Sequence, residues 1–212
     1  MIDPKRIVEA GYDAISERYT ALSREQDWGP RRDYLERVIR RVPAGSRVLE
    51  LGCGAGVPAT AELARHFDVT GVDISREQLR RAAENVPQAR FIHADMATLE
   101  LPEVFAAVVA FYSVTHLPRD EQPELFRRVR AWLEPGGVFV ANVAARDTER
   151  WVEPDWLGAP MYFSHFDAPT SLLLLARAGF KLEEAELVTQ DGIAGPETFC
   201  WVVATARERL SA

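Results

Sequence analysis

The sequence predicts an α/β fold in which a parallel sheet carries helices on both faces. Short apolar runs bounded by turn residues alternate with segments of helical periodicity between residues 47 and 143, and strands that alternate with helices of this length pair in parallel. The 212 residues suffice for one large α/β domain. No repeat, low-complexity tract or linker divides them, so we expect a single domain over residues 1–212.

The first half of the chain supplies two leading helices and then the alternating pattern. Apolar residues recur at helical spacing over 4–23, with a break expected near Gly11. Pro30 begins a second helix, over 30–41, because proline is tolerated in a first turn. The elements expected next are a strand at 47–51, a helix at 57–66, a strand at 68–73, a helix at 75–85 capped by Ser75, and a strand at 90–95.

The second half continues the pattern and then departs from it. The elements expected there are an apolar strand at 105–112, a helix at 119–133, a strand at 137–143, a helix at 170–178 and strands at 180–189 and 197–206. The intervening residues 144–168 are expected to be irregular, and they are rich in aromatic side chains. Because a long irregular stretch in a compact domain usually has a function, we expect it to be an insertion that roofs the substrate.

Charge and composition disfavour several classes of function. A net charge of −7 opposes binding to nucleic acid or to an anionic membrane, because the field of the protein repels phosphate. Basic pairs such as Arg31-Arg32 are interleaved with carboxylates and indicate solvated helix faces. Cys53 and Cys200 build neither a disulfide framework nor a metal site. With no signal-peptide pattern and no apolar run of membrane-spanning length, we expect a cytoplasmic protein; its oligomeric state is not indicated.

The stretch 48-VLELGCGAGVPAT-60 places three glycines in a turn between a strand and a helix. Parallel sheets bind ligands at the carboxyl ends of their strands, and glycine lets the backbone approach a ligand closely. Glycine spacing alone allows the pyrophosphate of a dinucleotide or S-adenosylmethionine (SAM). Val57, however, stands where the dinucleotide fingerprint requires glycine, and Glu50 would repel pyrophosphate but attract the ammonium and sulfonium of SAM. Asp73 ends the next strand, where either ligand needs an acid for its ribose.

Five motifs, in order, resemble those of the class I SAM-dependent methyltransferase superfamily, and the resemblance covers nearly the whole chain. They are 48-VLELGCGAG-56, 69-VTGVDIS-75, 91-FIHADM-96, 105-FAAVVAFYSVTHLP-118 and 133-LEPGG-137. The resemblance implies a Rossmann-like sheet of seven strands, mostly parallel, with an antiparallel last strand. It also implies SAM as the cofactor, S-adenosylhomocysteine (SAH) as the product, and a helical cap over the cofactor formed by residues 1–43.

The resemblance and the glycine turn together give an expected cofactor site. Asp73 would bind the ribose hydroxyls, Asp95 the adenine amine, and Ile74 and Met96 the faces of the adenine. Asp73 could also cap the next helix, and the two tyrosines of the cap, which share one helical face, could be packing aromatics instead. The expected cofactor-binding residues are Tyr12, Tyr19, Glu50, Gly52, Cys53, Gly54, Gly56, Asp73, Ile74, Asp95, Met96 and Phe111.

Methyl transfer from a sulfonium needs a base only if the acceptor must lose a proton, and positioning and desolvation can supply much of the rate. Two histidines are candidates for that base. His116 follows the strand that should face the methyl group, and His165 could be oriented by Asp167. Either histidine could instead be a packing residue, and Asp167 could cap a helix near Thr170. The expected substrate-binding residues are Tyr112, Trp151, Trp156, Tyr162 and His165.

The function expected from these features is transfer of a methyl group from SAM to oxygen or nitrogen of a small-molecule metabolite, a reaction of the EC 2.1.1 type. No metal is expected, because the clustered Asp, Asp and Asn pattern of metal-dependent catechol enzymes is not evident, although Asn142 follows the fifth strand. No nucleic-acid partner is expected, because the chain lacks an Asn-Pro-Pro-Tyr motif after the fourth strand and an appended RNA-binding module. Two alternatives stay open. One is a noncatalytic SAM-binding or interaction protein, and the other is a NAD-dependent oxidoreductase.

Overall fold

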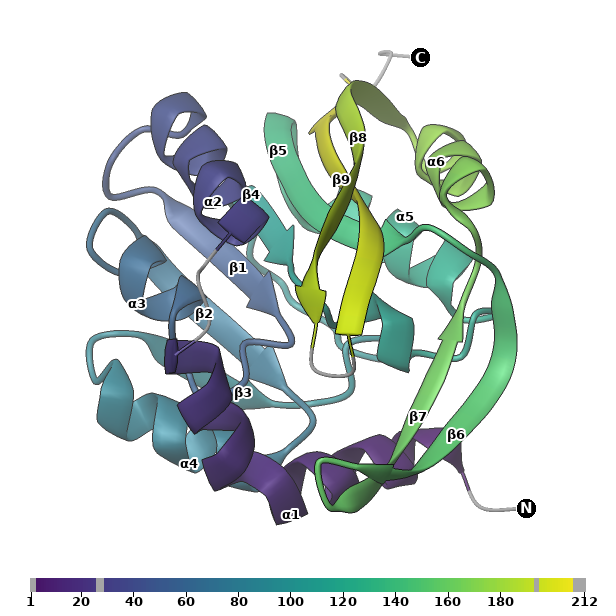
Figure 1. Ribbon diagram of the computed structural model, residues 1–212. Coiled ribbons are helices and arrows are strands. Elements are labelled where there is room, and N and C mark those ends of the chain that lie inside the picture. The colour runs from purple at the N-terminus through teal and green to yellow at the C-terminus, as the bar shows by residue number, and fades with distance from the viewer. Residues whose placement is uncertain (1–2, 26–28, 193–194, 208–212) are drawn as a thin grey trace.

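A seven-stranded sheet forms the centre of the protein, seen in a computed structural model that describes residues 3–25, 29–192 and 195–207. The strands lie in the order β3-β2-β1-β4-β5-β9-β8 (Figure 1). Neighbours pair in parallel, except that β9 is antiparallel to both β5 and β8. The expected mostly parallel sheet with an antiparallel last strand is confirmed. The strands are β1 (Arg47–Leu51), β2 (Asp68–Asp73), β3 (Arg90–His93), β4 (Phe105–Ala110), β5 (Leu133–Ala144), β8 (Phe180–Gly192) and β9 (Gly195–Ala206).

Helices cover both faces of this sheet because side chains alternate along each strand. On β1, Val48 packs with residues of α2 and α3, whereas Leu49 packs with residues of α5 and α6. Figure 1 shows α2, α3 and α4 on one side and α5 and α6 on the other. The helices are α1 (Pro4–Glu25), α2 (Gly29–Arg41), α3 (Ala59–Leu63), α4 (Arg76–Asn85), α5 (Gln122–Trp132) and α6 (Ala168–Arg177), with a 3-10 turn η1 (Val114–His116).

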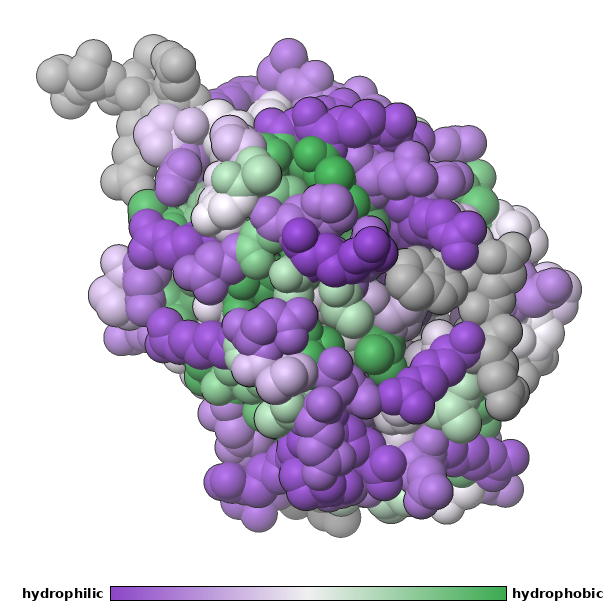
Figure 2. Space-filling view, turned by 90° about the vertical axis from the view of Figure 1, so that its left-hand side faces the viewer, coloured by the Kyte–Doolittle hydropathy of each residue, from purple (hydrophilic) through white to green (hydrophobic). Residues whose placement is uncertain are grey.

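The outer surfaces of the helices are polar. Figure 2 shows hydrophilic residues over most of the face that carries α2, α3 and α4. On α4, Arg80 pairs with Glu77, with 2.8 Å between Nη2 and Oε1, and also with Glu84. Arg80, which forms a basic pair in sequence with Arg81, therefore lies on a solvated helix face, as the sequence predicts for such pairs. Among the described residues, no helix combines the length and apolar character needed to cross a membrane.

Helix α1 is continuous, so the break expected near Gly11 is wrong. A Cβ atom on Gly11 would lie 2.6 Å from the carbonyl oxygen of Pro160 and 2.9 Å from Cε of Met161. Glycine stands there because α1 packs closely against a strand from the second half of the chain. Val8 and Ile15, on the same face of α1, are buried in that contact.

That strand belongs to a hairpin which the sequence analysis missed. Residues expected to be irregular form β6 (Thr148–Trp156) and β7 (Ala159–His165), an antiparallel pair separate from the main sheet. In Figure 1 the hairpin reaches from the main sheet to α1. Strand β7 buries Met161 and Tyr162 against α1. Strand β6 is largely exposed on both faces, so it lacks the apolar alternation by which a strand is recognised in sequence.

Candidate active site

The glycine turn lies where the strand order reverses, between β1 and β4, which is where open parallel sheets bind ligands. Backbone N–H groups of Gly52 and Cys53 donate to the carbonyl of Val72, at 2.8 and 3.0 Å. Gly52 has φ +74°, and a Cβ there would lie 2.3 Å from Cβ of Ser113. Only glycine therefore fits at position 52, and the turn is hydrogen-bonded to the neighbouring strand β2.

Gly54 shows that the other side of the turn is open. Its φ is +54°, and a Cβ there would meet only Oε1 of Gln78, at 3.9 Å. It borders two small cavities, which we name by position. The turn cavity, about 40 Å³, also contacts Glu50 and Arg31, and the central cavity, about 60 Å³, also contacts Asp73. A ligand in either one lies directly against the backbone of the turn.

Glu50 is a buried carboxylate facing the turn cavity. It is 3% exposed, and Oε2 accepts a hydrogen bond of 2.6 Å from the hydroxyl of Thr60 on α3. Burial raises the pKa of Glu50 to about 7, although the Thr60 bond and the charge of Arg31 oppose the rise. A buried carboxylate without an ion pair in the described chain is a site that a bound cation would stabilise.

Asp73 is held in place by the backbone around it. Oδ2 accepts from the N–H of Gly54 at 2.8 Å, and Oδ1 accepts from the N–H of Ser75 at 2.9 Å. Burial raises the pKa of Asp73, and these backbone bonds oppose that rise. Ser75 itself caps α4 by accepting from the N–H of Gln78. Each carboxylate oxygen of Asp73 keeps a free lone pair beside the central cavity, so hydroxyl groups can bind there.

Asp95 lies at a third small cavity of about 40 Å³, the end cavity, together with Ile74 and Met96. Oδ1 accepts from the N–H of Ala97 at 2.9 Å, and Oδ2 lies 2.6 Å from Nζ of Lys5 on α1. The sequence analysis did not anticipate Lys5 at this site. Its ion pair fixes the start of α1 beside the end cavity.

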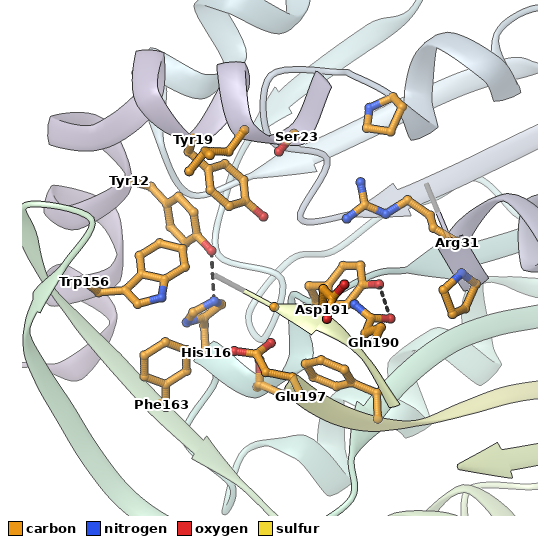
Figure 3. Close-up of a pocket in the computed structure, with 18 residues that line it drawn as sticks. Tyr12, Tyr19, Ser23, Arg31, His116, Trp156, Phe163, Gln190, Asp191 and Glu197 are labelled. Atoms are coloured by element: carbon orange, nitrogen blue, oxygen red, sulfur yellow. Dashed lines mark hydrogen bonds between the residues drawn. The ribbon is translucent and has the colours of Figure 1, made fainter. Parts of the chain in front are cut away.

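A much larger cavity, of about 440 Å³, adjoins the central cavity. We call it the large cavity. Tyr12, Tyr19, Tyr112 and His116 border both spaces, and Figure 3 shows the labelled side chains around it. Its other lining residues come from α1, the start of α2, the residue before α3, η1, the β6–β7 hairpin, and the ends of β8 and β9: Leu22, Ser23, Gly29, Pro30, Arg31, Pro58, Thr115, Trp156, Phe163, Gln190, Asp191, Gly192, Glu197 and Phe199.

His116 is buried and borders the end cavity, the central cavity and the large cavity. Its Nδ1 lies 2.9 Å from the carbonyl oxygen of Tyr162, which can only accept, so Nδ1 carries the proton. Nε2 then accepts from the hydroxyl of Tyr12 at 2.9 Å (Figure 3). Burial lowers the pKa of His116 to about 4, and burial raises the pKa of Tyr12 well above 10. Both side chains are therefore neutral at physiological pH.

Three expected substrate residues lie apart from the large cavity. Trp151 is 53% exposed, and Tyr162 is buried between α1 and β7. Nδ1 of His165 is bonded to the carbonyl of Arg146 at 2.8 Å, and neither this histidine nor the other two residues lines the cavity. Asp167 accepts from the N–H of Thr170 at 3.0 Å and caps α6. Of the two roles expected for Asp167, orienting His165 or capping a helix, the structure shows the helix cap.

Arg31 is a site residue that the sequence analysis assigned to a solvated helix face. Its guanidinium lies over the ring of Tyr112, 4.7 Å from the centroid. Its Nε is buried and has no hydrogen-bond partner among the described atoms, and the side chain borders both the turn cavity and the large cavity. Nothing local in the sequence distinguishes Arg31 from Arg32, because the fold alone brings it to this position.

The residues around the three small cavities fit SAM. The turn cavity offers Glu50 for a cation and the unsatisfied Nε of Arg31 for an anion, as the methionine part of SAM requires. The central cavity offers Asp73 for hydroxyl groups. The end cavity, bordered by Ile74, Ala94 and Met96, is apolar enough for a flat ring. No cluster of His, Cys, Asp and Glu side chains in the described ranges could hold a metal ion.

Fold and site together define an α/β protein with a glycine-rich turn at its switch point, and comparison with known proteins identifies the family. A profile of the methyltransferase domain matches residues 48–137. A probable SAM-dependent methyltransferase of Mycolicibacterium smegmatis is 30% identical over 190 residues, which are 87% of this chain and 71% of the relative. The chain belongs to the class I SAM-dependent methyltransferases, and its cofactor is SAM. The NAD-dependent alternative is set aside by this assignment.

Two further methyltransferases are similar to this chain, one in sequence and one in fold. Trans-aconitate 2-methyltransferase of Variovorax paradoxus is 40% identical over 121 residues, 54% of this chain and 44% of the relative. The fold is also that of the 1,6-didemethyltoxoflavin-N1-methyltransferase of Burkholderia thailandensis, with a TM-score of 0.72 at 18% identity, over 98% of this chain and 92% of the other.

Proposed function

We propose that the protein transfers the methyl group of SAM to oxygen or nitrogen of a small molecule bound in the large cavity. One observation carries the proposal. The large cavity and the central cavity share Tyr12, Tyr19, Tyr112 and His116 as lining residues, so ligands in the two spaces would lie against the same four side chains. The volume of about 440 Å³ suits a small metabolite.

The cofactor is proposed to lie along the three small cavities. Glu50 would attract the ammonium of the methionine part, and Arg31 would bind its carboxylate through the unsatisfied Nε. Asp73 would accept hydrogen bonds from the ribose hydroxyls, while Ile74 and Met96 enclose the adenine. Asp95 would hold Lys5 and, through it, α1 over the adenine.

The cavity walls are proposed to supply the rate mainly by positioning and by excluding water. SAM supplies a methyl group made electrophilic by its sulfonium. His116 is neutral and accepts from Tyr12, which leaves the lone pairs of the Tyr12 oxygen to accept a hydrogen bond from an O–H or N–H of the acceptor. We therefore assign this pair the task of orienting the acceptor rather than removing its proton.

Two segments close the site in this proposal. Residues 1–43 act as the helical cap, because α1 contributes Tyr12 and Tyr19 to the lining of both cavities. The stretch 144–168 acts as a roof through Trp156 and Phe163 of its hairpin. Small acceptors named for relatives, such as trans-aconitate and 1,6-didemethyltoxoflavin, support a small-molecule acceptor here.

Transfer of a tritiated methyl group from SAM to a broad panel of small molecules tests the proposal. Trp156→Ala should raise the KM for any acceptor found and leave the affinity for SAM unchanged. Trp151→Ala is the matched control, because this tryptophan lies on the same hairpin outside the cavity, and it should change neither quantity. Equal effects of the two substitutions on the acceptor KM would contradict the assignment of the large cavity. Binding of SAM without transfer to any acceptor would favour the noncatalytic alternative.

A further inference from the structure

The wall of the large cavity formed by β8 and β9 is acidic. Asp191 on β8 and Glu197 on β9 both line it, and Figure 3 shows them across the cavity from Tyr19. A Cβ atom on Gly192 would lie 2.4 Å from Cδ of Glu197. The Glu197 side chain therefore lies directly on the backbone of Gly192 and is held at the cavity.

Neither carboxylate has an ionic partner within the described part of the chain. No Lys, Arg or His nitrogen lies within 4.0 Å of Asp191 or Glu197 there, whereas Glu184, on the same hairpin, pairs with both Arg37 and Arg41. Asp191 and Glu197 are both exposed, yet partial burial of the Glu197 carboxyl at the cavity raises its pKa, and no neighbouring cation opposes the rise. A carboxylate in this state gains from a positive charge placed beside it.

The opposite wall of the large cavity is aromatic. The rings of Tyr12 and Trp156 meet edge to face with 5.6 Å between centroids, and Phe163 packs 6.1 Å from Trp156. Aromatic faces attract cations and pack against apolar groups. His116 is neutral, so Arg31 carries the one formal positive charge among those cavity-lining residues that the structure describes. The proposed function assigns Arg31 to the methionine carboxylate.

From this arrangement we propose that the methyl acceptor carries a cationic amine as a binding group on an apolar or aromatic body, and that the methylated atom is a separate O–H or N–H presented to the Tyr12 oxygen. Glu197 and Asp191 bind its ammonium group, and the aromatic wall binds its body. An anionic acceptor would meet two unpaired carboxylates in the same space, so the cavity discriminates against it. This inference rests on the proposed function, because it assumes that the large cavity holds the acceptor.

Three probes of nearly equal size and different charge test the inference without requiring turnover. Phenethylamine is protonated at pH 7, 2-phenylethanol is neutral, and phenylacetate is anionic. Each is titrated calorimetrically into the protein saturated with SAH. We expect phenethylamine to bind about fivefold or more tightly than 2-phenylethanol, as a partly exposed ion pair allows, and phenylacetate to bind most weakly. Added salt should reduce the preference for the amine.

Charge-removing variants identify the residues responsible. Glu197→Gln and Asp191→Asn should each weaken phenethylamine binding about two- to fivefold and leave 2-phenylethanol binding unchanged. Glu186→Gln, which removes the same charge from the hairpin outside the cavity, is the control and should change neither. Gly192→Ala should displace the Glu197 side chain and weaken phenethylamine binding as Glu197→Gln does.

Tightest binding of phenylacetate, equal binding of the amine and the alcohol, or no binding of any probe to the SAH complex would overturn the inference. The initial titration of SAH separates this result from a failure of the proposed function. If SAH does not bind, the cofactor site is wrong; if SAH binds and the charge preference is absent, only the amine assignment fails.

Discussion

Replacing Glu50 by glutamine should stabilise the protein without ligand and weaken its binding of SAM. Burial raises the pKa of this carboxyl from 4.5 to about 7, so keeping it ionised in the folded protein costs about 3 kcal/mol, at 1.36 kcal/mol for each pKa unit. Glutamine has nearly the same shape and still accepts the hydroxyl of Thr60, but it carries no charge. The variant therefore avoids the free-energy cost of burying a charge. In the native protein this charge serves to bind the cofactor.

The sign of the pH dependence follows from the raised pKa. Between pH 4.5 and about 7 the folded protein holds the Glu50 proton more tightly than the unfolded chain, so this group makes the free energy of unfolding fall as pH rises. Urea unfolding of both proteins at several pH values measures the effect. The difference in the free energy of unfolding should be near zero at pH 4.5 and should grow to about 2–3 kcal/mol in favour of Glu50→Gln above pH 7.

Cofactor binding gives the complementary measurement. A cation beside Glu50 lowers its pKa, so SAM binding near pH 7 should release a fraction of a proton, detected as a calorimetric heat that depends on the buffer. Glu50→Gln should lose both this dependence and about tenfold or more in affinity for SAM. A stability difference that stays flat from pH 5 to pH 8, or an unchanged affinity, would refute the role assigned to Glu50.

Three other substitutions test single contacts. Gly11→Ala should lower the free energy of unfolding by about 1–3 kcal/mol in urea titrations, because its Cβ would lie 2.6 Å from the carbonyl of Pro160; no loss would mean that α1 does not pack as described. Asp167→Ala should cost about 1 kcal/mol of stability through the lost helix cap and leave kcat unchanged. A large fall in kcat would instead show that Asp167 takes part in catalysis. Tyr12→Phe should lower kcat about tenfold while SAM affinity stays within about twofold, as loss of an orienting hydrogen bond predicts. The pH profile of kcat should show no inflection between pH 5.5 and 7.5 from His116, because burial lowers the pKa of His116 to about 4. An inflection near 6.5 that His116→Gln removes would show that His116 acts as a base.

Local patterns in the sequence were sufficient to predict the main sheet and the position of the glycine turn in it. The strand that ends at Leu51, the glycine turn after it and the acid Asp73 are all specified within a short span of sequence. Their spacing follows from the strand-turn-helix pattern, which a short run of consecutive residues specifies. The roles of Glu50, Asp73 and the other cofactor residues remain proposals.

The acceptor side depends on contacts between distant segments, and for that reason the sequence analysis missed much of it. Arg31 looked like its neighbour Arg32 until α2 was placed beside β4. Glu197 begins a predicted strand and Asp191 lies two residues beyond the predicted end of the strand 180–189, but only the sheet order brings both residues to the large cavity. The β6–β7 hairpin was missed because β6 is exposed on both faces, whereas its packing against α1 is specified by Gly11 far away in the chain.

Titration of SAH into the native protein and into Asp73→Asn tests the central claim most directly, because Asp73 joins the glycine turn to the proposed ribose site. We predict one molecule of SAH bound per chain with micromolar affinity in the native protein. Asp73→Asn should remain folded by circular dichroism and bind at least about 30-fold more weakly, since charge-assisted hydrogen bonds are lost. Unchanged SAH affinity in the folded variant would contradict the account, as would the absence of SAH binding by the native protein.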